Sequence, residues 1–208
     1  MEVLGVDGDD PSAEVLERAA TILAAGGLLI YPTDTLYAIG GRALDPKVGQ
    51  RVRAAKGRES KPLPLVAADV VQASSLTVAA APDALRLAQR FWPGPLTLIL
   101  VATREIPDEV TAGTGTVAVR VPALTLVRRL CQRAGPLIST SANPSGGPAP
   151  ITCAEAVAGV GHAVALALDG GPGRPLASTI VDLTGHSPRL VRQGAVPWAD
   201  VLASLQAG

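Results

Sequence analysis

Apolar and polar residues follow two kinds of pattern along this chain. Short apolar runs bounded by glycine, proline or aspartate predict strands, and longer stretches with apolar residues every three or four positions predict helices. The predicted strands span residues 27–31, 36–40, 63–67, 96–102, 116–121, 136–140, 163–168, 178–184 and 188–192. The predicted helices span residues 12–25, 46–55, 82–91 and 124–134, with a short helix after Thr152 and a last one after Pro197. Strands and helices are therefore interleaved along the sequence.

Residues that start and stop helices support these boundaries. Asp10 followed by Pro11 predicts an N-cap with proline at the first helical position, and Gly26-Gly27 ends that helix. Thr152 and Glu155 have the spacing of a capping box. The interleaved pattern predicts an α/β (α+β) fold in which helices flank a mixed, twisted β-sheet. The 208 residues fit one large domain. Without a repeat or a shift in composition, we expect residues 1–208 to form a single domain.

The strand predicted at 116–121 has the strictest alternation. Val117 and Val119 share one face, and Thr116 and Arg120 share the other. The valine face is expected in the core. Arg120 then points to the opposite side, where its charge needs solvent or an anion. An exposed arginine at a sheet edge is an equally simple interpretation of this strand alone.

Composition narrows the possible functions. Lys plus Arg and Asp plus Glu each number 18, so the formal net charge is zero. A protein that coats nucleic acid usually has a basic excess, which is absent here. Aromatic residues make up 2% of the chain, so the core has to be built from small aliphatic side chains.

The residues that commonly carry catalysis are sparse. Cys131 and Cys153 form no CxxC pair, which predicts two buried thiols in a reducing compartment. His162 and His186 have no partner nucleophile nearby, so we expect them at the surface. The sequence contains no P-loop, dinucleotide fingerprint or GxSxG elbow. With no signal peptide and no apolar run of about 20 residues, a cytoplasmic location without a membrane anchor is expected. Chemistry then falls to Lys, Arg, Ser, Thr and Asn.

Lys56 and Arg58 lie two residues apart after a predicted helix. In an extended segment both side chains would leave one face and could meet a polyphosphate, Arg58 in bidentate fashion. Ser139, Ser141 and Asn143 alternate in the same way after an apolar strand, where active-site loops often lie. A solvated basic turn and an ordinary Asn-Pro loop are the simpler alternatives for these two segments.

The order of these segments carries more information than any one of them. They occur in sequence as PTDTLYAIG, KGR with KPLPL, PGPLTLIL, VAVRVP, STSANPSG, STIVDL and LVRQGA. Over about residues 12–196 this order resembles the YrdC/TsaC family. The resemblance implies a YrdC/RibB-like fold and an enzyme that makes L-threonylcarbamoyl-AMP from L-threonine, bicarbonate and ATP, with release of pyrophosphate. It also implies transfer proteins that pass the threonylcarbamoyl group to tRNA.

The resemblance assigns roles residue by residue. L-Threonine would be bound by Thr35, Arg120, Ser141 and Ser178. ATP would be bound by Lys56, Arg58, Lys61, Thr116, Ser139, Asn143 and Arg192. Lys56 and Arg58 would be the catalytic cations, acting by positioning and charge neutralisation, and Mg²⁺ would be held by phosphates and water without protein ligands. The alternatives are a double-stranded RNA-binding module without catalysis, or a module that forms carbamoyl-adenylate. The expected partners include RNA through a weak contact.

Overall fold

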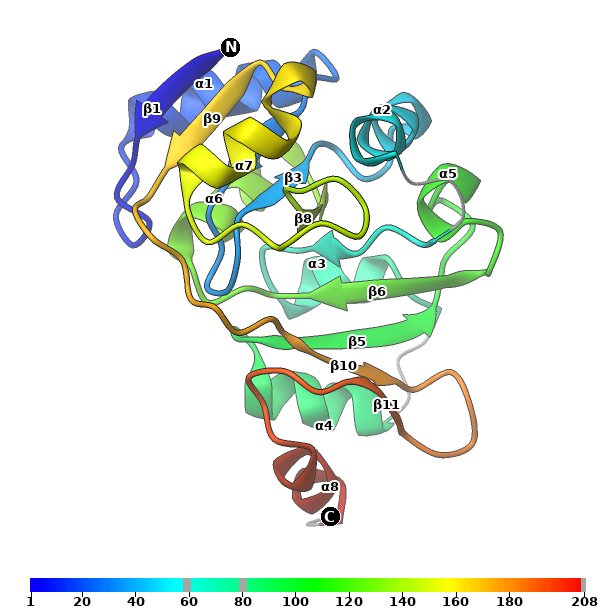
Figure 1. Cartoon of the computed structure of the whole chain (residues 1–208). Helices are drawn as coiled ribbons and strands as arrows, with labels where there is room; N and C mark the ends of the chain where they lie inside the picture. Colours follow the sequence, from blue (N-terminus) through cyan, green and yellow to red (C-terminus); the bar gives the residue numbers. More distant parts are fainter. Residues whose placement is uncertain (58–60, 79–81, 207–208) are drawn as a thin grey trace.

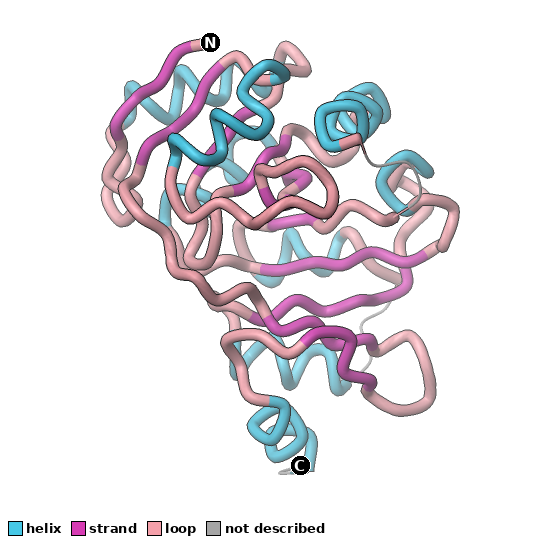
Figure 2. Tube along the Cα trace, in the orientation of Figure 1, coloured by secondary structure: helices cyan, strands magenta, loops and turns pink. Residues whose placement is uncertain are grey.

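The computed structural model describes residues 1–57, 61–78 and 82–206. Within these residues the strands form two mixed sheets. The first sheet has the order β1 (Glu2–Gly5), β9 (Leu166–Asp169), β2 (Leu29–Tyr31), β3 (Ala38–Gly40), β8 (Thr140–Ser141). The second sheet has the order β11 (Arg189–Arg192), β10 (Thr179–Asp182), β5 (Leu96–Val101), β6 (Thr116–Arg120), β4 (Leu65–Val66), β7 (Leu137–Ile138). Figure 2 shows the strands in two groups, with coil segments passing between them.

The helices lie between the strands in sequence, as expected. They are α1 (Ala13–Ala24), α2 (Pro46–Lys56), α3 (Val70–Ser75), α4 (Pro82–Phe91), α5 (Asp108–Thr111), α6 (Thr125–Ala134), α7 (Cys153–Val160), the 3₁₀ turn η1 (Gly161–Ala163) and α8 (Trp198–Gln206). Figure 1 shows the N-terminus at the β1 edge of the first sheet and the C-terminus after α8, at opposite ends of the molecule. The predicted α/β class with mixed sheets and flanking helices is confirmed.

Several details differ from the sequence-based expectation. The apolar run 136–140 is not one strand, because β7 pairs with β4 in the second sheet and β8 pairs with β3 in the first. Ser139 lies between them, where the chain crosses from one sheet to the other. The run looked continuous because residues on both sides of the crossing are buried. The strand β1 and the short helices α3 and α5 were not predicted.

The first helix also starts differently. Its N-cap is Ser12, whose hydroxyl accepts a hydrogen bond from the backbone nitrogen of Val15 at 3.3 Å, rather than Asp10. Pro11 therefore precedes the cap instead of following it. Serine is as good an N-cap as aspartate, so the choice depends on where the chain turns. The capping box of Thr152 and Glu155 is confirmed at the start of α7.

The two sheets meet where β3 passes β7. The Tyr31 hydroxyl donates to the carbonyl of Ile138 at 3.0 Å, and the backbone nitrogen of Ile138 donates to the carbonyl of Gly41 at 2.8 Å. A Cβ atom on Gly40 would lie 1.6 Å from the Ile138 carbonyl oxygen. Only glycine permits an approach this close. This junction places the turn before β3 beside the end of the second sheet.

Buried apolar side chains connect the two sheets. One cluster contains Ile39 of β3 together with Leu98 of β5 and Val181 of β10. A second cluster packs Leu23 of α1 and Leu130 of α6 against the first sheet. The side chains are mostly small and aliphatic, as the low aromatic content predicts.

Candidate functional site

The turn between β2 and β3 is built by threonine hydroxyls. The Thr33 hydroxyl accepts from the backbone nitrogen of Thr35 at 3.1 Å and donates to the carbonyl of Leu36 at 2.7 Å. It also lies 2.9 Å from the Thr35 hydroxyl. Local side-chain bonds of this kind hold tight turns in one shape. They fix Thr35, which is almost completely buried.

Arg120 ends β6 and reaches this turn. Its Nη1 donates to the Thr35 hydroxyl at 3.4 Å, and its Nη2 lies 3.5 Å from Oδ1 of Asp34. Burial lowers the pKa of Arg120, and the nearby charge of Asp34 opposes that effect. Because an arginine keeps its proton in proteins, the site contains a buried guanidinium beside a carboxylate.

The valines of β6 face the other way, as predicted. Val117 and Val119 are buried, while Thr116 is partly exposed. Thr116 shares a face with Arg120 but lies four residues earlier, about 13 Å along the strand. Its hydroxyl is 3.0 Å from that of Thr114. The strand therefore presents Thr116 and Arg120 at its two ends rather than side by side.

Ser178 and Arg192 meet on the second sheet. The Arg192 guanidinium donates from Nε and Nη2 to the Ser178 carbonyl at 3.1 and 2.9 Å, and from Nη2 to the Ser178 hydroxyl at 3.1 Å. The Thr97 hydroxyl of β5 lies 2.9 Å from the Ser178 hydroxyl. Partial burial lowers the pKa of Arg192, and the charge of Arg120 lowers it further. We call Asp34, Thr35, Thr97, Arg120, Ser178 and Arg192 the arginine cluster.

Lys56 organises a second group. Its ammonium donates to the carbonyls of Ser141 and Asn143 and lies 3.4 Å from the Asn143 side-chain oxygen. The Asn143 amide nitrogen donates to the carbonyl of Gly147 at 2.7 Å. We call Lys56, Ser141 and Asn143 the lysine cluster. Ser141 pairs with Ala38 at the start of β3, three residues after Thr35. Both clusters therefore flank the same short stretch of chain.

The expected extended geometry at Lys56 is wrong. Lys56 is the last residue of α2, and Gly57 ends the helix in a left-handed conformation with φ of 60°. A helix end followed by such a cap does not have the two-residue period of a strand. Arg58 lies outside the described residues.

The other predicted residues lie around these clusters. Ser139 occupies the crossing between the sheets, and its backbone nitrogen donates to the carbonyl of Pro64 at 2.8 Å. Lys61 is exposed. The structure thus groups Thr35, Arg120, Ser178 and Arg192, and separately Lys56, Ser141 and Asn143, whereas Lys61 and Thr116 belong to neither group.

A glycine-rich loop after β9 rests on the threonine turn. The backbone nitrogen of Arg174 donates to the carbonyl of Thr35 at 2.7 Å, and that of Gly173 donates to the carbonyl of Ile151 at 2.6 Å. The Tyr37 hydroxyl donates to the carbonyl of Gly171 at 2.6 Å. The loop is therefore attached by backbone contacts to the residue expected to bind threonine.

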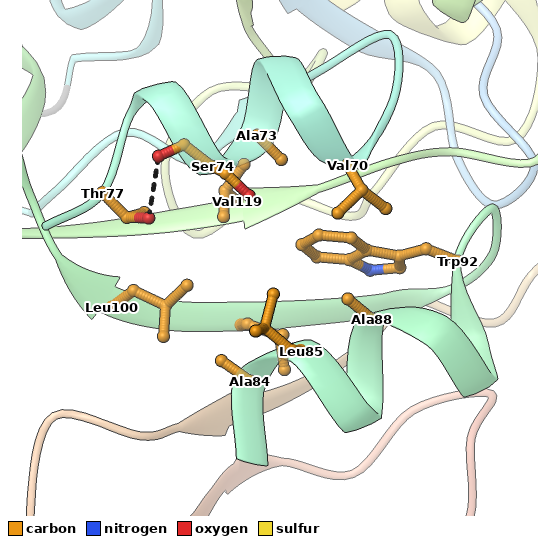
Figure 3. A pocket seen from close by; sticks show the side chains of 11 residues that line it. Val70, Ala73, Ser74, Thr77, Ala84, Leu85, Ala88, Trp92, Leu100 and Val119 are labelled. Carbon is orange, nitrogen blue, oxygen red and sulfur yellow. Dashed lines mark hydrogen bonds between the residues drawn. The ribbon is translucent and has the colours of Figure 1, made fainter. Parts of the chain in front are cut away.

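The crevice in Figure 3 is a different feature. It lies between α3 and α4, where Trp92, Leu100 and Val119 line it with other mainly apolar side chains. Its volume is about 10 Å³, room for about one water molecule, whereas ligand pockets hold roughly 300–1,000 Å³. Val119 is on the opposite face of β6 from Arg120, so the crevice belongs to the core side of the sheet.

Among the described residues, no three His, Cys, Asp or Glu side chains group closely enough to bind an ion. His162 and His186 are exposed and Cys131 and Cys153 are buried, as predicted. None of the described helices combines the length and apolar character that a bilayer crossing requires.

Asp34 and Thr97 were missed by the sequence analysis. Asp34 lies between the strands predicted at 27–31 and 36–40, and no role was predicted for it, although PTDT holds a carboxylate between two hydroxyls. Thr97 interrupts the apolar run LTLILV, and a lone hydroxyl in a buried strand needs a partner. That partner, Ser178, is 81 residues away, and no local pattern connects the two.

Known proteins resemble the chain over most of its length. The model of the Sua5_yciO_yrdC family, described as "Telomere recombination", matches residues 21–194. Threonylcarbamoyl-AMP synthase of Pyrococcus abyssi is 37% identical over 186 residues, which cover 88% of this chain and 55% of that protein. The chain thus spans little more than half the length of this curated relative.

Solved structures agree. P. abyssi Sua5 complexed with L-threonine is 33% identical with a TM-score of 0.94, covering 99% of this chain and 61% of that one. E. coli YciO is 27% identical with a TM-score of 0.86, covering 95% of this chain and 98% of that one. The resemblance seen in the sequence motifs is thereby confirmed, and the chain belongs to the Sua5/YciO/YrdC family.

Proposed function

We propose that this chain makes L-threonylcarbamoyl-AMP from L-threonine, bicarbonate and ATP and releases pyrophosphate. The observation that carries the proposal is the arginine cluster, in which a buried Arg120 lies beside hydroxyls at the junction of two sheets. The name of the P. abyssi relative and the L-threonine in its Sua5 complex support this reading over an RNA-binding module or a carbamoyl-adenylate-forming module.

In this proposal Thr35, Arg120 and Ser178 of the arginine cluster bind the amino acid together with Ser141 of the lysine cluster, while Arg192 faces ATP. The forked guanidinium of Arg120 matches a carboxylate, and its hydrogen bond to Thr35 is long enough to yield to a stronger acceptor. The hydroxyls of Thr35, Ser141 and Ser178 provide partners for the remaining polar atoms of L-threonine.

The lysine cluster and its neighbours bind ATP. Lys56, Arg58, Lys61 and Arg192 supply positive charge, and Thr116, Ser139 and Asn143 supply polar contacts. Lys56 is held by backbone carbonyls, so its ammonium is already oriented before a phosphate arrives. The phosphates and water would hold Mg²⁺, which offsets phosphate charge.

The reaction then needs no covalent bond to the protein. The threonine amine attacks the carbon of bicarbonate or carbon dioxide and forms a carbamate, with loss of water or a proton. A carbamate oxygen attacks the α-phosphorus of ATP, and the bond to the β-phosphate oxygen breaks to release pyrophosphate. Lys56, Arg58 and Arg192 lower the barrier by holding the groups in line and neutralising the developing charge.

The proposal also covers the partners, the location and the domain organisation of the chain. The product is passed on by transfer proteins that modify tRNA, with RNA contact by this chain weak at most because its net charge is zero. The reaction occurs in the cytoplasm, where buried unpaired thiols stay reduced. Residues 1–208 act as one domain, because buried side chains of both sheets form a common cluster.

Mass spectrometry tests the activity directly. The chain is incubated with ATP, Mg²⁺, L-threonine and ¹³C-bicarbonate, and each component is omitted in turn. The expected result is threonylcarbamoyl-AMP carrying the label, formed only in the complete mixture. Product formed from carbamoyl phosphate without threonine would instead support the carbamoyl alternative. Absence of any adenylate product would contradict the proposal.

Arg58→Ala tests the proposed catalytic cation. A charged hydrogen bond contributes about 1.5–3 kcal/mol, so threonine-dependent pyrophosphate release should fall about ten- to a hundredfold. Normal turnover at saturating ATP would remove Arg58 from the mechanism.

A further inference from the structure

Asp34 is a charged residue in the arginine cluster whose side-chain oxygens accept no hydrogen bond from any part of the chain that the structure describes. Its side chain is 12% exposed. Neither carboxylate oxygen has a hydrogen-bond donor among the described residues, and both are covered by protein atoms. A buried carboxylate in this condition is costly, and each such group in a folded protein calls for an explanation.

The carboxylate is not used to build the turn. Elsewhere in this chain aspartates in turns accept backbone N–H groups, as Asp7 does from Asp9 at 2.8 Å and Asp182 does from Thr184 at 2.9 Å. In the turn at 32–36 the Thr33 hydroxyl takes that role. The Asp34 carboxylate is therefore not needed to hold the turn together. Its Oδ1 lies 3.5 Å from Nη2 of Arg120.

The contact is an ion pair without a hydrogen bond. Charges at this distance attract strongly in a partly buried site even when the N–H groups do not point at the oxygens. Asp34 and Thr35, which are consecutive in the chain, each lie near one terminal nitrogen of the Arg120 guanidinium. The turn thus holds the guanidinium while leaving donor capacity for another acceptor.

The charge is also needed. Arg120 is buried, and burial disfavours its positive charge, whereas the charge of Asp34 favours it. Without this counter-charge, burial would favour moving the Arg120 side chain out of the cluster. A carboxylate bound at Arg120 would meet a guanidinium that is already in place.

We propose that Asp34 is a positioning residue for amino-acid binding, holding the Arg120 guanidinium in the arginine cluster so that its free donors meet the carboxylate of the substrate. This rests on the proposed function, because it takes L-threonine as the ligand. Asp34 acts through Arg120, since its own oxygens are covered.

Calorimetric titration with L-threonine tests the idea. Asp34→Asn keeps the shape and removes the charge, and its threonine Kd is expected to rise at least tenfold. The Kd for ATP, measured on the same samples, is expected to stay within twofold of wild type. Asp34→Glu restores the charge and is expected to recover most of the threonine affinity. Asp182→Asn is the matched control, because it removes a carboxylate paired with Arg189 at 2.7 Å outside the cluster, and threonine affinity should not change.

A double-mutant cycle separates positioning from general damage. In an Arg120→Met background, Asp34→Asn should cause no further loss of threonine affinity, because the group through which it acts is gone. Independent, additive losses would overturn the inference, as would equal losses in Asp34→Asn and Asp34→Glu. Should Asp34→Asn fail to fold, Asp34→Ser takes its place, both in the comparison with Asp34→Glu and in the double-mutant cycle.

The outcomes also distinguish the two proposals. If the wild-type chain does not bind L-threonine, the proposed function fails and the role of Asp34 fails with it. If wild type binds L-threonine and Asp34→Asn binds it equally well or more tightly, the function stands and the role of Asp34 alone is refuted.

Discussion

The hydroxyl pair of Thr97 and Ser178 shows how one side chain can support another in the site. Thr97 is buried in β5, and its hydroxyl lies 2.9 Å from that of Ser178. Ser178 is itself held by Arg192. A threonine in the middle of a buried strand costs desolvation unless its hydroxyl is paired. Thr97 therefore holds the Ser178 hydroxyl in place within the arginine cluster.

Thr97→Val removes this hydroxyl and keeps the shape. The free energy of unfolding is expected to fall by about 1 kcal/mol, because Ser178 loses a buried partner. Threonine affinity should fall too. Thr103→Val is the matched control, since the Thr103 hydroxyl is buried without a hydrogen-bond partner among the described residues. Its stability in urea should be unchanged or higher. Equal losses in the two variants would show that the Thr97–Ser178 contact contributes nothing specific.

Residue patterns predicted some of these positions and not others. Strict alternation in TVAVRV placed Arg120 opposite the valine face, and the structure confirms that placement. The same reasoning failed at Lys56, because the segment is helical up to Lys56 and turns at Gly57. The roles of Thr97 and Asp34 could not be predicted from local alternation, because the residues they contact come from distant parts of the sequence.

Gly40 allows the strands β3 and β7 to lie in close contact. The strand β3 passes so close to β7 that a Cβ on Gly40 would lie 1.6 Å from the Ile138 carbonyl oxygen. Beside this contact, the backbone nitrogen of Ile138 donates to the carbonyl of Gly41 and so joins the two sheets. The glycine is therefore needed for the approach of the strands, and not for a left-handed backbone.

Gly40→Ala is expected to destabilise the chain by about 3 kcal/mol or more, because two strands would have to separate to admit the methyl group. Gly5→Ala provides the control within the first sheet, since a Cβ there meets nothing within 4 Å. Urea unfolding of both variants gives the comparison. A Gly40→Ala chain as stable as Gly5→Ala would mean that the sheets join differently.

The capping box of α7 predicts a dependence on pH. Backbone hydrogen bonds from Ile151 and Thr152 lower the pKa of Glu155 from its ordinary value of 4.5. A depressed pKa means that the folded chain favours the ionised carboxylate. The stability it adds is complete above pH 4.5 and disappears as the pH falls through the lower folded-state value. The stability advantage of wild type over Glu155→Gln should therefore be present at neutral pH and vanish in acid. Urea midpoints with an equal gap at both pH values would contradict this.

Element boundaries were predicted well where caps and periodicity agreed. The box at Thr152 and the helix at 124–134 are examples. The run 136–140 was misjudged, because a change of sheet leaves no mark in a pattern of buried residues. β1 was missed because it is short and half-exposed.

The molecule as a whole has a common interior for both sheets. Ile39 and Leu98, from different sheets, belong to the same buried cluster. Neither sheet could keep that face covered alone, because each supplies part of the other's packing surface. The aromatic residues happen to report on the two parts separately, with Tyr31 and Tyr37 at the first sheet and Trp92 and Trp198 near the second.

Thermal or urea unfolding should therefore be a single transition. Tryptophan fluorescence follows the second sheet, and tyrosine second-derivative absorbance follows the first. Coincident midpoints are expected if the core is shared. Separate midpoints would show two independently folding units and refute the single-domain proposal.

The α/β class could be predicted from the sequence because interleaved strands and helices have few other packing solutions. The division into two sheets could not. It depends on a close backbone contact at Gly40 and on strand pairings such as β6 with β4, which are set by three-dimensional fit. The order of short motifs along the sequence, from PTDTLYAIG to LVRQGA, is by itself sufficient to indicate the family.

The hairpin of β10 and β11 brings Ser178 and Arg192 to partners made much earlier on the ribosome. Ser178 meets Thr97 across 81 residues, and Lys56 meets Asn143 across 87. A nascent polypeptide that ends before Ser178 lacks Ser178 and Arg192, two of the residues proposed to bind the substrates. If these residues bind the substrates as proposed, the chain becomes able to bind them only near the end of its synthesis. Fragments that end before β11 should therefore bind neither ATP nor threonine.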